Sequence, residues 1–74
     1  MRYAIADSAL KHGIAYATIL DCVLQADLIG ADRTGLLWWC GRSSSGAALE
    51  IAGFATDDGA IILIHAMPME WRRR

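Results

Sequence analysis

Two short blocks place side chains suited to phosphate chemistry at the ends of apolar strands. His65 lies in the block IHAMP, residues 64–68, and Arg42 lies in the block CGRSS, residues 40–44. Histidine exchanges a proton near neutral pH, and the planar fork of arginine matches two phosphate oxygens. A hydrophobic core has no use for either group there, so both residues are candidates for acid–base or anion-binding chemistry.

Arg42 precedes a turn of serine and glycine, residues 43–46. Backbone amides and hydroxyls in such a turn can cradle an anion while the guanidinium adds positive charge. Arg42 and Ser43 are therefore predicted phosphate ligands. Loops of serine and glycine are common, and the alternative is a solvated hairpin loop without a ligand.

His65 also has a structural alternative. Its strand carries isoleucine and leucine on both faces, so the ring is expected to be buried. A histidine at the edge of a core can be satisfied by a backbone carbonyl and do no chemistry. Glu50 is a conceivable base, but its position between Leu49 and Ile51 favours exposure to solvent on the alternate face of its strand.

A third block, ALKHGI at residues 9–14, ends a predicted helix with two basic side chains. Lys11 and His12 are favoured at a helix C-terminus by the dipole alone, whatever their function. The same pair, pointing from the helix end into a groove, can also grip a phosphate.

Tryptophan and arginine supply further candidates for binding. Trp38 and Trp39 are neighbours in a strand, so one is expected in the core and the other on the surface. An exposed tryptophan stacks on a base or, more often, anchors a protein partner, and Trp71 has the same two interpretations. Arg72, Arg73 and Arg74 are predicted to contact phosphates, with an acidic partner or a solvated tail as alternatives.

Length and composition limit the class of protein. The 74 residues are expected to form one domain, residues 1–74. With 55% hydrophobic residues the domain has more apolar surface than it can bury, so we expect a partner, and a homo-oligomer when the chain is alone. The net charge of −1 confines any contact with nucleic acid to local patches.

The sequence also predicts that several features are absent. It contains no run of about 18 apolar residues, which predicts neither a membrane span nor a signal peptide and favours the cytoplasm. Cys22 and Cys40 lack metal-ligand spacing and are expected to be buried thiols. No metal or other cofactor is predicted.

Apolar spacing predicts two helices followed by four strands. Asp7 or Ser8 is expected to cap a helix over residues 7–12 that ends at Gly13, and a second helix covers residues 15–25. The first predicted strand begins at residue 28, and the other three cover residues 35–41, 47–55 and 60–67. A tight DDG turn at residues 57–59 joins the last two strands. The predicted fold is α+β, with two N-terminal helices packed on an antiparallel sheet of about four strands.

The three blocks, in this order over roughly residues 8–70, resemble the BrnT-like toxins of bacterial type II toxin–antitoxin systems, a branch of the RelE/ParE superfamily. The similar segments are Lys11-His12-Gly13, the GRSSSG turn and the IHAMP strand. The resemblance implies helices on one face of a twisted antiparallel sheet and an active groove on the other. It also implies that residues 1–6 are the remnant of a first strand.

As function, the resemblance implies a ribonuclease that arrests growth and is neutralised by a cognate antitoxin with a ribbon-helix-helix DNA-binding part. Metal-independent RNA cleavage needs a base for the 2′-OH proton, a cation for the charged phosphorane and an acid for the leaving 5′ oxygen. The predicted catalytic residues are Arg42, His65, Lys11 and His12, and the predicted RNA contacts are Arg42, Ser43, Arg72, Arg73 and Arg74.

The alternative is a non-catalytic α+β protein-interaction module related to such toxins. The two hypotheses differ in geometry. A cluster of Lys11, Arg42 and His65 favours the enzyme, whereas separation of the three favours the module.

Overall fold

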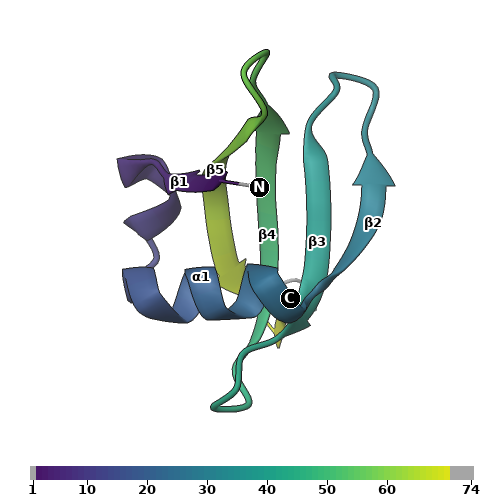
Figure 1. Cartoon of the computed structure of the whole chain (residues 1–74). Coiled ribbons are helices and arrows are strands. Elements are labelled where there is room, and N and C mark those ends of the chain that lie inside the picture. The colour runs from purple at the N-terminus through teal and green to yellow at the C-terminus, as the bar shows by residue number, and fades with distance from the viewer. Residues whose placement is uncertain (1, 71–74) are drawn as a thin grey trace.

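Residues 2–70 are described by the computed structural model, in which a helix lies across one face of a sheet (Figure 1). In chain order the elements are β1 (Arg2–Ile5), the 3₁₀ helix η1 (Asp7–Leu10), α1 (Tyr16–Gln25), β2 (Asp27–Ala31), β3 (Leu37–Arg42), β4 (Ala48–Ala55) and β5 (Ala60–Pro68). None of the helices in this part of the chain is long and apolar enough to cross a membrane.

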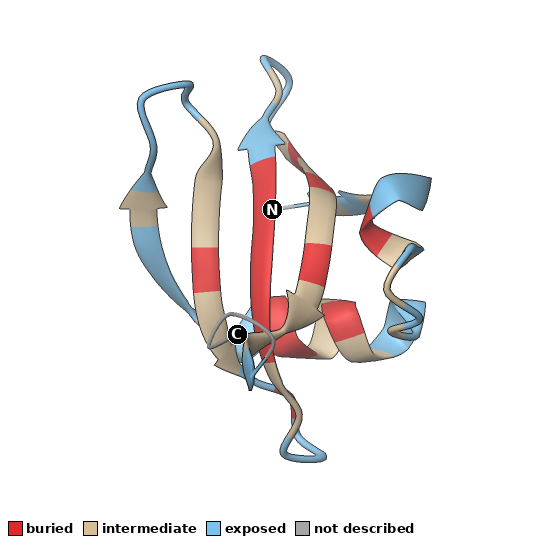
Figure 2. Cartoon of the chain, turned by 180° about the vertical axis from the view of Figure 1, so that it is seen from behind, coloured by how far each residue is buried: buried red, intermediate tan, exposed pale blue. Residues whose placement is uncertain are grey.

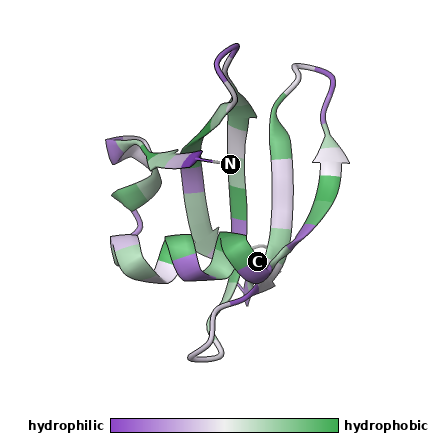
Figure 3. Cartoon of the chain, in the orientation of Figure 1, coloured by the Kyte–Doolittle hydropathy of each residue, from purple (hydrophilic) through white to green (hydrophobic). Residues whose placement is uncertain are grey.

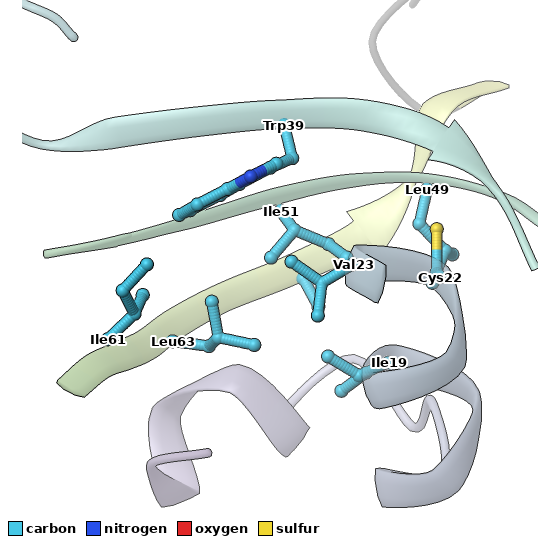
Figure 4. Close-up of a cluster of buried hydrophobic side chains, with 9 residues drawn as sticks. Ile19, Cys22, Val23, Trp39, Leu49, Ile51, Ile61 and Leu63 are labelled. Carbon is cyan, nitrogen blue, oxygen red and sulfur yellow. The ribbon is translucent and has the colours of Figure 1, made fainter. Parts of the chain in front are cut away.

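Helix α1 forms where apolar residues recur on one side of the chain. Ile19, Cys22 and Val23 are buried, and Cys22 and Val23 follow Ile19 by three and four residues, the spacing that gathers side chains on one helix face. This face packs on β3, β4 and β5, whose buried side chains appear in Figure 4: Trp39, Leu49, Ile51, Ile61 and Leu63. Burial raises the pKa of the Cys22 thiol, so Cys22 is a neutral part of the core.

The sheet has the strand order β1-β5-β4-β3-β2. Strands β2 to β5 are antiparallel neighbours, whereas β1 lies parallel to β5, with Arg2 opposite Ala60 and Ile5 opposite Leu63. The predicted fold of two helices on an antiparallel sheet of about four strands is therefore wrong. Within residues 2–70 the sheet is mixed, has five strands and is covered by one α-helix. The sequence pattern does not predict the pairing of β1 with β5. Parallel strands are joined by long connections, so no short turn between them marks the pair.

The predicted helix over residues 7–12 is also wrong, because only the single 3₁₀ turn η1 forms there. A helix of one turn forms too few hydrogen bonds to offset the unfavourable free energy of helix nucleation. The chain leaves β1 immediately before it, where Ala6 N–H donates to the Leu63 carbonyl. Ser8 does not cap η1 but donates its hydroxyl to the carbonyl of Ile64 at 2.8 Å. These two bonds fasten η1 to the edge of β5.

The predicted hairpins are present. Thr56 N–H donates to the Ala60 carbonyl across the turn between β4 and β5, and Gly59 has φ +87°, a conformation that favours glycine. Figure 3 shows that the tip of this hairpin is hydrophilic, in contrast to the apolar strands it joins. The serine turn likewise joins β3 to β4. Seen from behind, most of β4 is buried, whereas the edge strand β2 is largely exposed (Figure 2).

Candidate functional site

Trp38, Ala52 and His65 form one row on the face of the sheet opposite α1, which we call the distal face. Trp39 and Ile51 belong to the core against α1, so their neighbours Trp38 and Ala52 lie on the other face. Trp38 pairs with Ala52, and Ala52 pairs with His65. Because Ala52 is small, the rings on either side approach each other, with centroids 5.8 Å apart and planes inclined by 60°.

A β-bulge in β5 brings His65 to the distal face. Leu63 pairs with Gly53 and the next paired residue is His65, which leaves Ile64 without an opposite residue on β4. In a regular strand His65 would share the face of Leu63 and enter the core. Gly53 permits this arrangement, because a Cβ at that position would collide with the carbonyl oxygen of Ile62.

The Glu50 carboxylate holds the His65 ring. Glu50 is only 5% exposed, and the His65 side chain is 24% exposed. His65 Nε2 lies 3.1 Å from Glu50 Oε2. An ionised carboxylate only accepts hydrogen bonds, so the ring donates Nε2–H, and a neutral ring then carries its lone pair on Nδ1. The expectation of an exposed Glu50 is wrong, and the partner of His65 is a carboxylate rather than a backbone carbonyl.

His12 reaches the same cluster from the turn that follows η1. Its ring centroid lies 5.9 Å from that of His65, with an interplanar angle of 85°. His12 is half-buried, and the neighbouring Lys11 is exposed. Two predicted catalytic residues, His12 and His65, are thus brought together, and Lys11 is next to one of them in the chain.

Beside the Glu50–His65 pair lies a cavity of about 340 Å³. It is lined by Ile29, Gly30, Ala31, Asp32, Trp38 and Glu50. Trp38 Nε1–H donates to Asp32 Oδ2 at 3.0 Å, which fixes the indole.

Asp32 is held ionised at the rim of this cavity. The Thr34 hydroxyl, the Trp38 indole and the backbone amides of Thr34 and Leu36 donate to its carboxylate. These bonds, that from the Thr34 hydroxyl first, lower the pKa of Asp32 from its ordinary value of 3.8 to about 2. The carboxylate is therefore a permanent acceptor near neutral pH.

Arg42 lies apart from the histidines. It pairs with Ala48, whereas His65 pairs with Ala52, and four residues along β4 correspond to about 13 Å. Its Nη1 donates to the Gly46 carbonyl at 3.0 Å, so the guanidinium closes its own turn. The structure does not bring Arg42 together with His65.

The serine turn already holds an anion from the protein itself. Ser44 donates its backbone N–H to Asp21 Oδ2 at 2.7 Å and its hydroxyl to Oδ1 at 3.0 Å. The backbone bond is the main reason why the pKa of Asp21 lies below its ordinary value. Ser43 is buried, and its backbone N–H donates to the Ala47 carbonyl. The turn is therefore docked on α1 through Ser44 and Asp21, although Ser44, Ser45 and Gly46 remain exposed.

The remaining predicted RNA contacts, Arg72, Arg73 and Arg74, lie outside the described residues, as does Trp71. Within residues 2–70, no three His, Cys, Asp or Glu side chains are grouped so that they could hold a metal ion.

Sequence reasoning names Glu50 as a conceivable base but misses its bond to His65, and it misses Asp32 altogether. A usable signal exists for Glu50, since it is a carboxylate in a strand whose neighbours on both faces are apolar. No such signal exists for Asp32, which resembles an ordinary turn residue.

Comparison of the chain with protein-family models, with curated proteins and with solved structures finds no match.

Proposed function

We propose that this chain is a ribonuclease toxin of a type II toxin–antitoxin system, similar to the BrnT-like toxins, and that it cleaves RNA by acid–base chemistry without a metal. The observation that best supports the proposal is the Glu50–His65 pair with the His12 ring beside it. A histidine oriented by a buried carboxylate is suited to proton transfer. The two histidines also come from two of the blocks on which the resemblance rests.

In this proposal His65 Nδ1 takes the proton of a ribose 2′-OH. The 2′ oxygen attacks the adjacent phosphorus, and the bond from phosphorus to the 5′ oxygen breaks. Protonated His12 gives its proton to that leaving oxygen, so the products carry a 2′,3′-cyclic phosphate and a 5′-hydroxyl. Lys11 stabilises the charge that develops on the phosphorane. Glu50 is a positioning residue that acts through His65.

The test is cleavage of a labelled RNA by the purified chain in the presence of EDTA. We expect products with cyclic phosphate ends and no cleavage next to a single 2′-deoxy substitution. His65→Ala should lower the rate by roughly 10²- to 10⁴-fold, the usual contribution of a general acid or base. Glu50→Gln should lower kcat more than it changes KM, because it disturbs the orientation of His65 rather than RNA binding.

Glu70→Gln is the matched control, since Glu70 is the other glutamate of the chain and is exposed. Its rate should equal that of the wild type. Wild-type activity in folded His65→Ala, or loss of all cleavage in EDTA, would contradict the proposed mechanism.

We also propose that the protein acts in the cytoplasm with a cognate antitoxin that has a ribbon-helix-helix DNA-binding part. The exposed apolar side chains Leu24, Leu28 and Ile29 support a protein partner. Expression of the chain should arrest growth, and co-expression of the antitoxin should relieve the arrest.

A second candidate is a non-catalytic protein-interaction module related to such toxins. The separation of Arg42 from His65 favours it, because this arginine is not placed to meet a phosphorane at the histidines. Binding of a partner protein by a wild-type chain that cleaves no RNA would support the module over the enzyme.

A further inference from the structure

We infer that the cavity beside Trp38 is a binding site for a small organic cation whose nitrogen carries methyl groups in place of N–H, such as the quaternary ammonium group of choline. The inference goes beyond the proposed ribonuclease activity and does not depend on it. It rests on the aromatic wall of the cavity, on the sign of its charges, and on the hydrogen bonds that its carboxylates already accept.

Trp38 gives the cavity an aromatic wall in a fixed position. Its indole N–H donates to Asp32 Oδ2 at 3.0 Å, and its ring meets that of His65 with centroids 5.8 Å apart. Among aromatic side chains, tryptophan attracts a cation to its face most strongly. Because the indole is oriented before a ligand arrives, binding costs little side-chain entropy.

The size and the apolar surface of the cavity suit a methylated group. Its volume of about 340 Å³ is near the lower end of the range for small-molecule sites. Ile29 of β2 is 65% exposed and lines the cavity, so it offers apolar surface to the methyl groups of a ligand. The cavity therefore fits a small compound.

The charges around the cavity favour a cation. Asp32 and Glu50 line it, and none of its described lining residues is Lys, Arg or His. The pKa of Asp32 is about 2, so this carboxylate is ionised near neutral pH. Glu50 is only 5% exposed, and the attraction of a carboxylate for a cation is stronger where water is excluded. The cavity should therefore repel anions and attract cations.

The two carboxylates have little capacity for further hydrogen bonds. Asp32 already accepts four, and Glu50 is bonded to His65. A primary ammonium would lose hydrogen bonds to water on entering the cavity and would find few acceptors in exchange. A quaternary ammonium donates no hydrogen bonds, so it gains the attraction of the charges and of the indole without this loss. The cavity should therefore prefer a methylated ammonium to a primary one.

The experiment compares three probes on the purified chain at equal ionic strength. They are choline, ethanolamine, which has a primary ammonium, and the uncharged analogue of choline in which carbon replaces the nitrogen. The readout is the NMR signal of the Trp38 indole N–H, assigned with Trp38→Phe. We expect choline to shift this signal saturably and the other two probes to bind several-fold more weakly.

Variants separate the aromatic contribution from that of charge, and binding to them is measured by saturation transfer to the methyl groups of the probe. Trp38→Leu should weaken choline binding by roughly 2- to 30-fold, the range for a cation on an aromatic face. Asp32→Asn should weaken binding of choline but not of its uncharged analogue. Asp57→Asn removes the same charge from an exposed position in the turn between β4 and β5, and it should bind like the wild type.

Three results would overturn the site: an unmoved Trp38 signal, equal binding of choline and its uncharged analogue, or full choline affinity in Trp38→Leu. If Asp32→Asn does not fold, the three probes on the wild type still decide. A peptide that contains trimethyllysine is the last probe. Tighter binding of this peptide than of choline would overturn a free compound as the ligand, whereas weaker binding would support it.

Discussion

His65 and Glu50 depend on each other. A buried carboxylate is costly unless a charged or hydrogen-bonding partner satisfies it, and His65 Nε2–H does so here. Ala52 contributes by being small, since its methyl group leaves room for the Trp38 and His65 rings to meet. The position of the His65 ring therefore depends on Glu50, which bonds to it, and on Ala52, which leaves space beside it.

The first residue-scale prediction concerns this space. Ala52→Leu should separate the Trp38 and His65 rings and lower the free energy of unfolding by about 1 to 3 kcal/mol, the usual cost of overpacking. Ala52 is fully buried, so the larger side chain has no route to solvent. Urea denaturation measures the loss, and the Trp38 indole signal reports the ring contact. Unchanged stability would show that the space between Trp38 and His65 can hold a leucine side chain, and it would contradict this prediction.

A second prediction concerns acid. The pKa of Asp32 is about 2 in the folded chain and 3.8 ordinarily, so its bonds stabilise the fold fully above about pH 4. This contribution is lost as the pH falls from about 4 to about 2. Asp32→Asn should therefore be less stable than the wild type at about pH 6, and the difference should shrink at about pH 2.5. If the difference in stability between the two proteins stayed constant across this pH range, it would contradict the lowered pKa of Asp32.

At the scale of elements, the local features could be predicted and the long-range ones could not. Helix α1 and strands β2 to β5 follow from apolar spacing and turn residues, and the blocks around His12 and His65 contain two residues that the structure brings together. The pairing of β1 with β5 and the bulge at Ile64 depend on contacts between distant segments. Alternation correctly gives Glu50 the face opposite its core neighbours. Its burial there depends on packing that alternation does not encode.

The bulge gives an element-scale prediction. Gly53→Ala should destabilise the fold by about 1 to 3 kcal/mol, because its Cβ meets the Ile62 carbonyl and forces β4 and β5 apart. The proposed RNA cleavage should fall as well, because the same bulge brings His65 to the distal face.

Gly59→Ala is the comparison for Gly53→Ala. Its Cβ has open space, but φ +87° costs about 1 to 2 kcal/mol for a residue other than glycine. Thermal denaturation should show similar losses for the two variants. Only Gly53→Ala should lose activity below its melting temperature, and equal activity would show that the bulge does not set the site.

At the scale of the molecule, apolar side chains near the β2 edge are exposed. Leu24 is 64% and Leu28 54% exposed, and among the described strands β2 has a neighbour on one side only. An apolar edge strand of this kind favours association with another chain.

We therefore predict that the purified chain is a dimer or larger at high concentration. Sedimentation velocity at several concentrations measures this. Leu28→Lys should shift the population toward monomer, whereas Ala17→Lys adds the same charge at another exposed position and should not. A wild type that stays monomeric at every concentration would contradict the prediction.

The parallel pairing of β1 with β5 also determines when the protein can fold during its synthesis. Residues 2–5 are made well before their partners, residues 60–63, which are among the last of the described residues to be made. Pairings between distant segments form slowly, because a long loop must close before any bond is gained. His65 lies beyond that partner segment, and the carbonyls that fasten η1 belong to the same strand. The proposed catalytic cluster therefore cannot assemble on a nascent chain until nearly all of its sheet has been translated.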